Sequence, residues 1–109
     1  MADTFKVLGQ SKPSAASLTA AYTVPGATSA VVSSITAANQ SSVPTAIRVS
    51  IAIAGAADTA AQYIAYDLPI AGNETISLTL GIGLATTDVV RVYNTLATVS
   101  FNVFGVEIT

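Results

Sequence analysis

Apolar and polar residues alternate with a period of two along most of the chain, a pattern typical of β-strands that bury one face. The clearest example is the segment 45–54, in which every second residue is a large aliphatic one and the residues between are small or polar. The aliphatic positions of this segment are Ile47, Val49, Ile51 and Ile53. Because alternate side chains of a strand point to opposite faces, we expect these four residues to face the core.

Similar patterns predict seven further strands, at residues 4–8, 18–24, 29–37, 62–67, 74–80, 89–93 and 98–104. Residues that favour turns, chiefly Gly, Pro, Asn, Asp and Ser, separate these segments. The Ala-rich segment 56–61 predicts at most one helical turn, because so short a helix needs packing to be stable. Eight short strands at nearly regular spacing predict an all-β fold, an eight-stranded β-sandwich that is jelly-roll-like and has Greek-key connections.

A weak internal repeat accompanies this pattern. Residues 21–25 resemble residues 65–69, and residues 47–50 resemble residues 90–93, with offsets of 44 and 43 positions. Either the two halves arose by duplication, or the strands and turns of one sandwich simply use the same residue types. The jelly-roll prediction depends on neither interpretation.

Composition indicates that this sandwich is a structural building block that packs against other protein. Charged residues make up 9% of the 109 residues, whereas about 25% is usual. The surface must therefore consist largely of Ser, Thr, Ala, Asn and Gln, which suits packing against other protein. The length fits one domain. We expect an N-terminal arm at residues 1–14 and a single sandwich domain at residues 15–109.

Several residue types that common catalytic sites need are missing. The chain has no His and no Cys, which removes the usual general base, the commonest metal ligand and any thiolate nucleophile. Its six acidic residues lie mostly in or beside predicted turns, where carboxylates are ordinary solvated or backbone-capping groups. The Gly81-Ile-Gly83 sequence is expected to relax a strand into a tight bend. We therefore expect no enzymatic activity, no cofactor and no metal.

The basic residues and the apolar stretches exclude two classes of partner. Four basic residues spread along the chain do not form the cluster that follows a phosphate backbone, so no nucleic-acid binding is expected. No apolar stretch approaches the ~20 residues of a membrane-spanning helix. The first residues also lack the basic and apolar regions of a secretory signal.

Five residues are candidates for contacts with a protein partner: Lys6, Lys12, Arg48, Arg91 and Phe104. The two lysines lie in the predicted arm, which would lie along an acidic surface or add a strand to a neighbouring sheet. Each arginine lies in mid-strand on the polar face. It either pairs with a carboxylate across a subunit boundary or opposes aggregation as an outward charge. The outward Phe104 either belongs to a satellite core or anchors in a partner's pocket.

The tyrosines bear on a sugar-binding alternative, because sugar sites combine an aromatic platform with adjacent polar groups. Tyr63 and Tyr66 are three positions apart in a predicted strand. A regular strand would place them on opposite faces. The pattern therefore argues against a cleft that contains both rings.

Five segments carry a resemblance to a known class of proteins. They are residues 6–10 (KVLGQ), 22–25 (YTVP), 64–67 (IAYD), 87–93 (TDVVRVY) and 99–108 (VSFNVFGVEI). Over nearly its whole length, the chain resembles small, His-poor, Ala/Thr/Ser-rich virion structural proteins of tailed bacteriophages, either capsid decoration (cement) proteins or tail-associated modules. The resemblance implies a jelly-roll-like sandwich, many copies per virion and no catalysis. It assigns no functional residue, and the lack of a long repeat stalk argues against a stand-alone fibre.

These observations predict a capsid decoration protein, a homo-oligomer that binds the outer shell and stabilises contacts between subunits of the major capsid protein. The first alternative is a tail, collar or baseplate-associated module that contacts other virion proteins. Copy number distinguishes the two, since a decoration protein is present in far more copies than a tail module. The second alternative is a receptor- or carbohydrate-binding sandwich.

Overall fold

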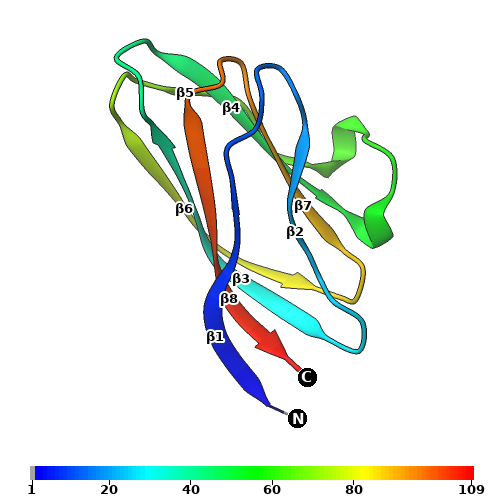
Figure 1. The fold of residues 1–109 in the computed structure, drawn as a ribbon. Helices are drawn as coiled ribbons and strands as arrows, with labels where there is room; N and C mark the ends of the chain where they lie inside the picture. Colours follow the sequence, from blue (N-terminus) through cyan, green and yellow to red (C-terminus); the bar gives the residue numbers. More distant parts are fainter. Residues whose placement is uncertain (1) are drawn as a thin grey trace.

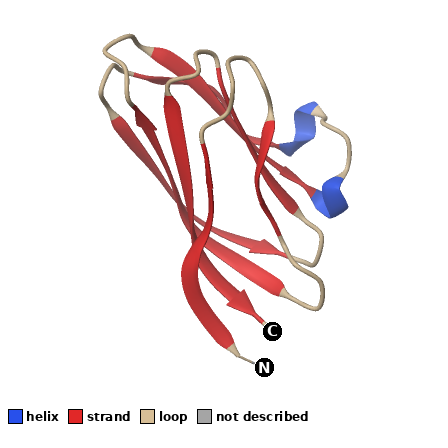
Figure 2. Ribbon diagram, in the orientation of Figure 1, coloured by secondary structure: helices blue, strands red, loops and turns tan. Residues whose placement is uncertain are grey.

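The computed structural model describes residues 2–109, which form two antiparallel sheets packed face to face (Figures 1 and 2). The strands are β1 (Asp3–Ser11), β2 (Thr19–Thr23), β3 (Ser29–Asn39), β4 (Thr45–Ala52), β5 (Tyr63–Ile70), β6 (Thr75–Leu84), β7 (Val89–Asn94) and β8 (Val99–Ile108). Two short 3-10 turns, η1 (Ile53–Gly55) and η2 (Ala60–Gln62), lie between β4 and β5. All eight predicted strands are present, and the all-β prediction is confirmed.

The strand order is that of a jelly roll. The first sheet has the order β1-β8-β3-β6 and the second has the order β2-β7-β4-β5. The connection from β4 to β5 joins neighbours within one sheet, and each of the other connections crosses from one sheet to the other. Two interlocked Greek keys have this connectivity, which confirms the predicted eight-stranded sandwich.

The core lies between the sheets and is almost entirely aliphatic. Ile47 and Val49 of β4 are fully buried there, as their alternation predicts. The largest fully buried side chains are Phe101, Ile35, Ile47, Ile70, Val24, Val32, Val49, Val90, Val92, Val99, Val103 and Asn94. Apart from the asparagine, packing of branched and aromatic side chains at interior density holds the two sheets together.

The prediction that Ile53 faces the core is wrong: its side chain is 74% exposed. β4 ends at Ala52, and Ala54 adopts φ 54°, a left-handed conformation that interrupts the alternation of faces. The segment 53–62 then folds against the outer face of β4 and β7 (Figure 1). For this reason Ser50 and Ala52 are buried although they point away from the core.

The segment expected to be an N-terminal arm lies largely within the sandwich. Residues 3–11 form β1, an edge strand of the first sheet, which pairs with β8 from Asp3 opposite Ile108 to Ser11 opposite Phe101. The first sheet is therefore incomplete without these residues. Residues 12–18 connect β1 to β2.

β6 also departs from the prediction, because it continues through Gly81 and Gly83 to Leu84 instead of ending at residue 80. The pairing of β6 with β3 shifts between Val32, which lies opposite Ile82, and Ser34, which lies opposite Thr79. Two residues of β6, Leu80 and Gly81, lie opposite the single residue Ser33 of β3. The one extra residue forms a β-bulge, which kinks β6 without ending it.

The internal repeat follows a local symmetry of the second sheet. It relates β2 to β5 and β4 to β7, which are the outer and inner pairs of strands in the order β2-β7-β4-β5. Val49 and Val92 face each other at the centre, Arg48 lies opposite Tyr93, and Arg91 lies opposite Ser50. A two-fold rotation about the Val49–Val92 pair therefore exchanges the two arginines.

Candidate functional site

Three of the predicted contact residues make their polar contacts within the chain. Lys6 donates a hydrogen bond from Nζ to Oε1 of Glu107 at 3.0 Å. Arg91 donates from its two Nη atoms to the carbonyl oxygens of Ala56 and Gly55 at 2.9 and 3.2 Å. This arginine therefore fastens the segment 53–62 to the second sheet.

Arg48 is held from three sides on the outer face of the second sheet. Its Nε donates to Oδ1 of Asp67 at 2.7 Å. Its guanidinium carbon lies 4.2 Å from the ring centroid of Tyr66 and 4.4 Å from that of Tyr93. The hydrogen bond to Asp67 is the main cause that raises the pKa of Arg48 above its ordinary value. Arg48 is therefore a charged, fixed donor between two aromatic rings.

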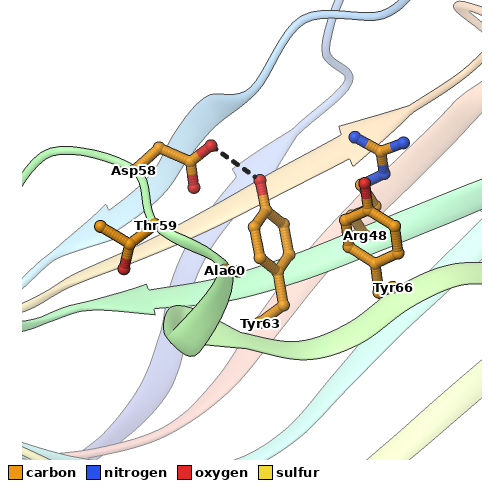
Figure 3. A pocket seen from close by; sticks show the side chains of 6 residues that line it. All are labelled: Arg48, Asp58, Thr59, Ala60, Tyr63 and Tyr66. Carbon is orange, nitrogen blue, oxygen red and sulfur yellow. Dashed lines mark hydrogen bonds between the residues drawn. The ribbon is translucent and has the colours of Figure 1, made fainter.

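A pocket of about 510 Å³ lies beside Arg48, between β5 and the segment 53–62 (Figure 3). Its lining residues are Arg48, Asp58, Thr59, Ala60, Tyr63 and Tyr66. The volume falls within the range of ~300–1,000 Å³ that is usual for small-molecule sites.

The hydroxyl of Tyr63 donates to Oδ2 of Asp58 at 3.0 Å, which ties one wall of the pocket to the other (Figure 3). Burial and then this hydrogen bond raise the pKa of Tyr63 above its ordinary value, so its hydroxyl stays protonated as a donor. The rings of Tyr63 and Tyr66 pack edge to face, with centroids 5.1 Å apart and an interplanar angle of 90°. This arrangement is the preferred one for aromatic pairs.

The prediction that Tyr63 and Tyr66 lie on opposite faces is wrong, and a β-bulge is the reason. Val49 of β4 lies opposite Ala65, and the next residue, Ser50, lies opposite Tyr63. Ile64 is therefore an extra residue on β5. Because one inserted residue reverses the alternation of faces, two positions three apart come to the same side of the strand. The sequence contains no Gly or Pro at this position that indicates a bulge.

A second surface feature lies on the outer face of the first sheet. We call it the apolar face and define it as Phe5 and Val7 of β1, Val31 of β3, and Phe104 and Val106 of β8. Three of these side chains are exposed, Phe5 at 81%, Val7 at 47% and Val31 at 39%, and the other two are half-buried.

The pairing of the strands makes the apolar face contiguous. Val106 lies opposite both Phe5 and Val31, and Phe104 lies opposite Val7. Residues directly opposite in an antiparallel sheet share a face, so the five side chains adjoin one another. Phe104 is thus part of a larger apolar surface and not a solitary side chain. Lys12 is exposed and follows the other end of β1, away from Phe5.

Two of the acidic residues in turns, Glu74 and Asp88, accept hydrogen bonds from the backbone. Oε1 of Glu74 accepts a hydrogen bond from the backbone N–H of Ala71. Asp88 accepts from the N–H groups of Ala54 and Ala85, one on each oxygen, and it is buried where the sequence suggested a solvated residue. Within residues 2–109, no group of His, Cys, Asp and Glu is arranged to hold a metal ion.

Asn39 and Asn94 are buried polar residues that sequence analysis treated only as turn residues. Asn94 donates from Nδ2 to the carbonyl oxygen of Pro13 and accepts on Oδ1 from the N–H groups of Thr98 and Val99. Asn39 donates to the carbonyl oxygens of Val43 and Ala71. Each of these amides bonds a nearby residue and also one distant segment, Ala71 for Asn39 and Pro13 for Asn94, and the distant partner has no local sequence signature.

In the part of the chain that the structure describes, no helix is long and apolar enough to cross a membrane. Comparison with known proteins places the chain in no family: no family model, no curated protein and no solved structure matches it significantly.

Proposed function

We propose that this protein is a virion structural protein of a tailed bacteriophage, a capsid decoration protein that binds the outer shell and stabilises contacts between major capsid subunits. The observation that carries the proposal is the apolar face. A contiguous, solvent-exposed apolar surface on a small domain marks a contact site for another protein. With 9% charged residues, the rest of the chain also suits a crowded protein environment.

The apolar face and the neighbouring strand β6 suit a close contact with another protein. None of its five residues carries a charge. Gly83 lies opposite Val31 on β6, and a Cβ atom added at Gly81 or Gly83 would meet nothing within 4 Å. Glycine in a strand with open space above it allows another backbone to approach closely. A partner of matching chemistry is an uncharged, apolar patch repeated on a shell of identical subunits.

Decoration requires no chemistry at the contact, which agrees with the missing catalytic residue types. Each copy contributes one modest interface, and linked copies on a repeating lattice add up through effective concentration. β1 is the edge strand beside the apolar face. An edge strand presents unpaired backbone groups that pair readily with another chain. We therefore include association between copies of this chain, as a homo-oligomer, in the proposal.

The internal contacts of Lys6, Arg48 and Arg91 move the proposed contact away from these residues and onto Phe5, Phe104 and their neighbours. Deleting the predicted arm would remove β1 and disrupt the first sheet, so point substitutions on the apolar face are the appropriate test.

The test is the copy number of the chain in purified virions of the phage that encodes it, measured by gel densitometry against the major capsid protein. A simple ratio to the capsid subunits is expected. A few copies per particle would replace this proposal with the tail, collar or baseplate alternative. Absence from virions would contradict both proposals.

Variants then test the surface itself. Phe5→Ser and Val31→Ser are expected to lower the occupancy of purified chain added to undecorated capsids. Ile53→Ser is the control, because Ile53 is also apolar and exposed but lies in the segment against the second sheet. Equal occupancy for all three variants would rule out the apolar face as the contact.

A further inference from the structure

We infer that the pocket beside Arg48 binds a neutral pyranose sugar, either free or as the terminal residue of a longer glycan. The pocket lies on the outer face of the second sheet, whereas the apolar face lies on the first sheet. The inference is therefore independent of the proposed contact with a capsid shell.

Tyr66 supplies the platform on which a sugar ring can stack. Its side chain is 60% exposed, unusually high for a large aromatic residue in the middle of a strand. Arg48 and Tyr63 both pack against its ring, so the orientation of the platform is fixed before any ligand arrives. A fixed ring binds with a smaller loss of side-chain entropy than a mobile one. The C–H groups on one face of a pyranose are the natural partner of such an exposed aromatic surface.

Polar groups of both kinds lie around this platform. Asp58 uses Oδ2 to accept from Tyr63, and Oδ1 accepts no hydrogen bond from any residue among 2–109. Arg48 uses Nε for Asp67, and its two Nη atoms donate to none of the described residues. A sugar hydroxyl both donates and accepts, so adjacent hydroxyls match a carboxylate oxygen and a guanidinium N–H together.

The charges of the pocket favour a neutral sugar over an acidic one. Arg48 is already paired with Asp67, and Asp58 adds a second carboxylate on the opposite wall. The pocket lining therefore carries one positive and one negative group, and the positive group is already neutralised by Asp67 outside the lining. A sugar carboxylate or phosphate bound in the same pocket would be repelled by the negative charge of Asp58. The neutral hydroxyls of a hexose satisfy Asp58 without that cost.

The experiment uses the full chain with two readouts. The labelled protein is applied to a printed glycan array, and its backbone amides are followed by NMR during titration with methyl β-galactoside, methyl β-glucoside and N-acetylneuraminic acid. We expect at least one neutral glycoside to shift the amides of residues 58–66, with weak affinity in the millimolar range typical of so small a ligand. Neutral-ended glycans on the array are expected to bind more strongly than sialylated ones.

Four variants test whether the sugar binds in the pocket beside Arg48. Tyr66→Ala removes the platform and is expected to weaken binding at least about tenfold. Tyr66→Phe keeps the ring and is expected to bind within about twofold of the parent chain. Asp58→Asn is expected to weaken binding, whereas Ile53→Ala, which changes an exposed side chain outside the pocket, is expected to leave binding unchanged.

Three results would overturn the inference. The first is that neither neutral glycoside shifts residues 58–66 and no neutral glycan on the array is bound. The second is that folded Tyr66→Ala, judged by its amide spectrum, binds as tightly as the parent chain. The third is that N-acetylneuraminic acid binds more tightly than the neutral glycosides, which would assign the pocket to an acidic ligand.

Discussion

Tyr22 and Glu107 join the two sheets of the sandwich through one hydrogen bond. The hydroxyl of Tyr22, on β2 of the second sheet, donates to Oε2 of Glu107, on β8 of the first sheet, at 2.7 Å. Lys6 on β1 donates to the other carboxylate oxygen. A single carboxylate thus connects three strands at the end of the sandwich where both termini lie (Figure 1).

Removing the Tyr22 hydroxyl is expected to destabilise the fold. A hydrogen bond to a charged group contributes ~1.5–3 kcal/mol to stability. When the Tyr22 hydroxyl is removed, the Glu107 carboxylate keeps its other partner, Lys6, which reduces the loss. We therefore expect Tyr22→Phe to lower the free energy of unfolding in urea by about 1–2 kcal/mol. Tyr66→Phe is the matched control, since the Tyr66 hydroxyl has no hydrogen-bond partner within residues 2–109. Equal effects of the two variants would contradict the role of the inter-sheet bond.

Glu107 is expected to make stability depend on pH in the acid range. The hydrogen bonds from Tyr22 and then Lys6 lower the pKa of Glu107 below its ordinary value of 4.5. The folded protein therefore binds this proton more weakly than the unfolded chain does. The resulting stabilisation is fully present above the unfolded pKa and is lost as pH falls through the folded pKa.

Urea denaturation from about pH 7 to about pH 3 measures this dependence, because the range spans the titration of a Glu side chain. Glu107→Gln is expected to be less stable than the parent chain at neutral pH, and the difference is expected to shrink as pH falls. A difference that stays constant over the whole range would show that the charge of Glu107 does not contribute.

Two glycines of the first sheet are expected to respond oppositely to substitution. A Cβ added at Gly105 would overlap the carbonyl oxygen of Val31, whereas one added at Gly83 would meet nothing within 4 Å. Gly105→Ala is therefore expected to lower the free energy of unfolding by about 1–3 kcal/mol. Gly83→Ala is expected to raise it by ~0.5 kcal/mol, because alanine restricts the unfolded chain. Thermal and urea unfolding of the two variants measure these changes. A similar response at both positions would contradict this account.

The buried amide of Asn94 is expected to contribute more to the free energy of unfolding than the exposed amide of Asn102. Asn94→Ala would remove the side-chain acceptor of the Val99 N–H and one of the two acceptors of the Thr98 N–H, whose other acceptor is the carbonyl oxygen of Leu96. We expect a loss of about 1–3 kcal/mol in unfolding free energy. Asn102→Ala is the control, because Asn102 accepts an exposed hydrogen bond from Gln10. Its removal is expected to change the unfolding free energy by less than ~0.5 kcal/mol. Comparable losses for both variants would contradict the importance of burial.

Sequence analysis predicted the strands well where alternation continues without interruption, as in β4 up to Ala52. It failed where one residue changes the alternation. Ile53 is exposed because β4 ends at Ala52 and the chain turns away at Ala54. Ala54 takes a left-handed conformation, for which alanine has no special preference. Tyr63 and Tyr66 came together because Ile64 is an extra residue opposite β4. In both cases the local sequence fits a regular strand, and packing of the whole domain imposes the irregularity.

For the candidate sites too, the local sequence predicted single side chains, and the tertiary structure supplied their neighbours. Phe104 could be recognised as outward-facing from alternation alone, but its neighbours on the apolar face come from β1 and β3, far away in sequence. The partners of Arg48 could not be predicted either. Asp67 and Tyr66 reach it through an irregular pairing of β4 with β5, and Tyr93 through the pairing of β4 with β7.

By itself, then, the sequence determined an all-β sandwich with an aliphatic core and a nearly uncharged surface, because alternation, turn chemistry and composition are local properties of the chain. Only the tertiary structure decided which strands pair, where a bulge reverses a face and which distant side chains form the pocket and the apolar face. The reason is physical: register depends on the packing of the whole core, and a shift of one residue moves each later side chain to the opposite face.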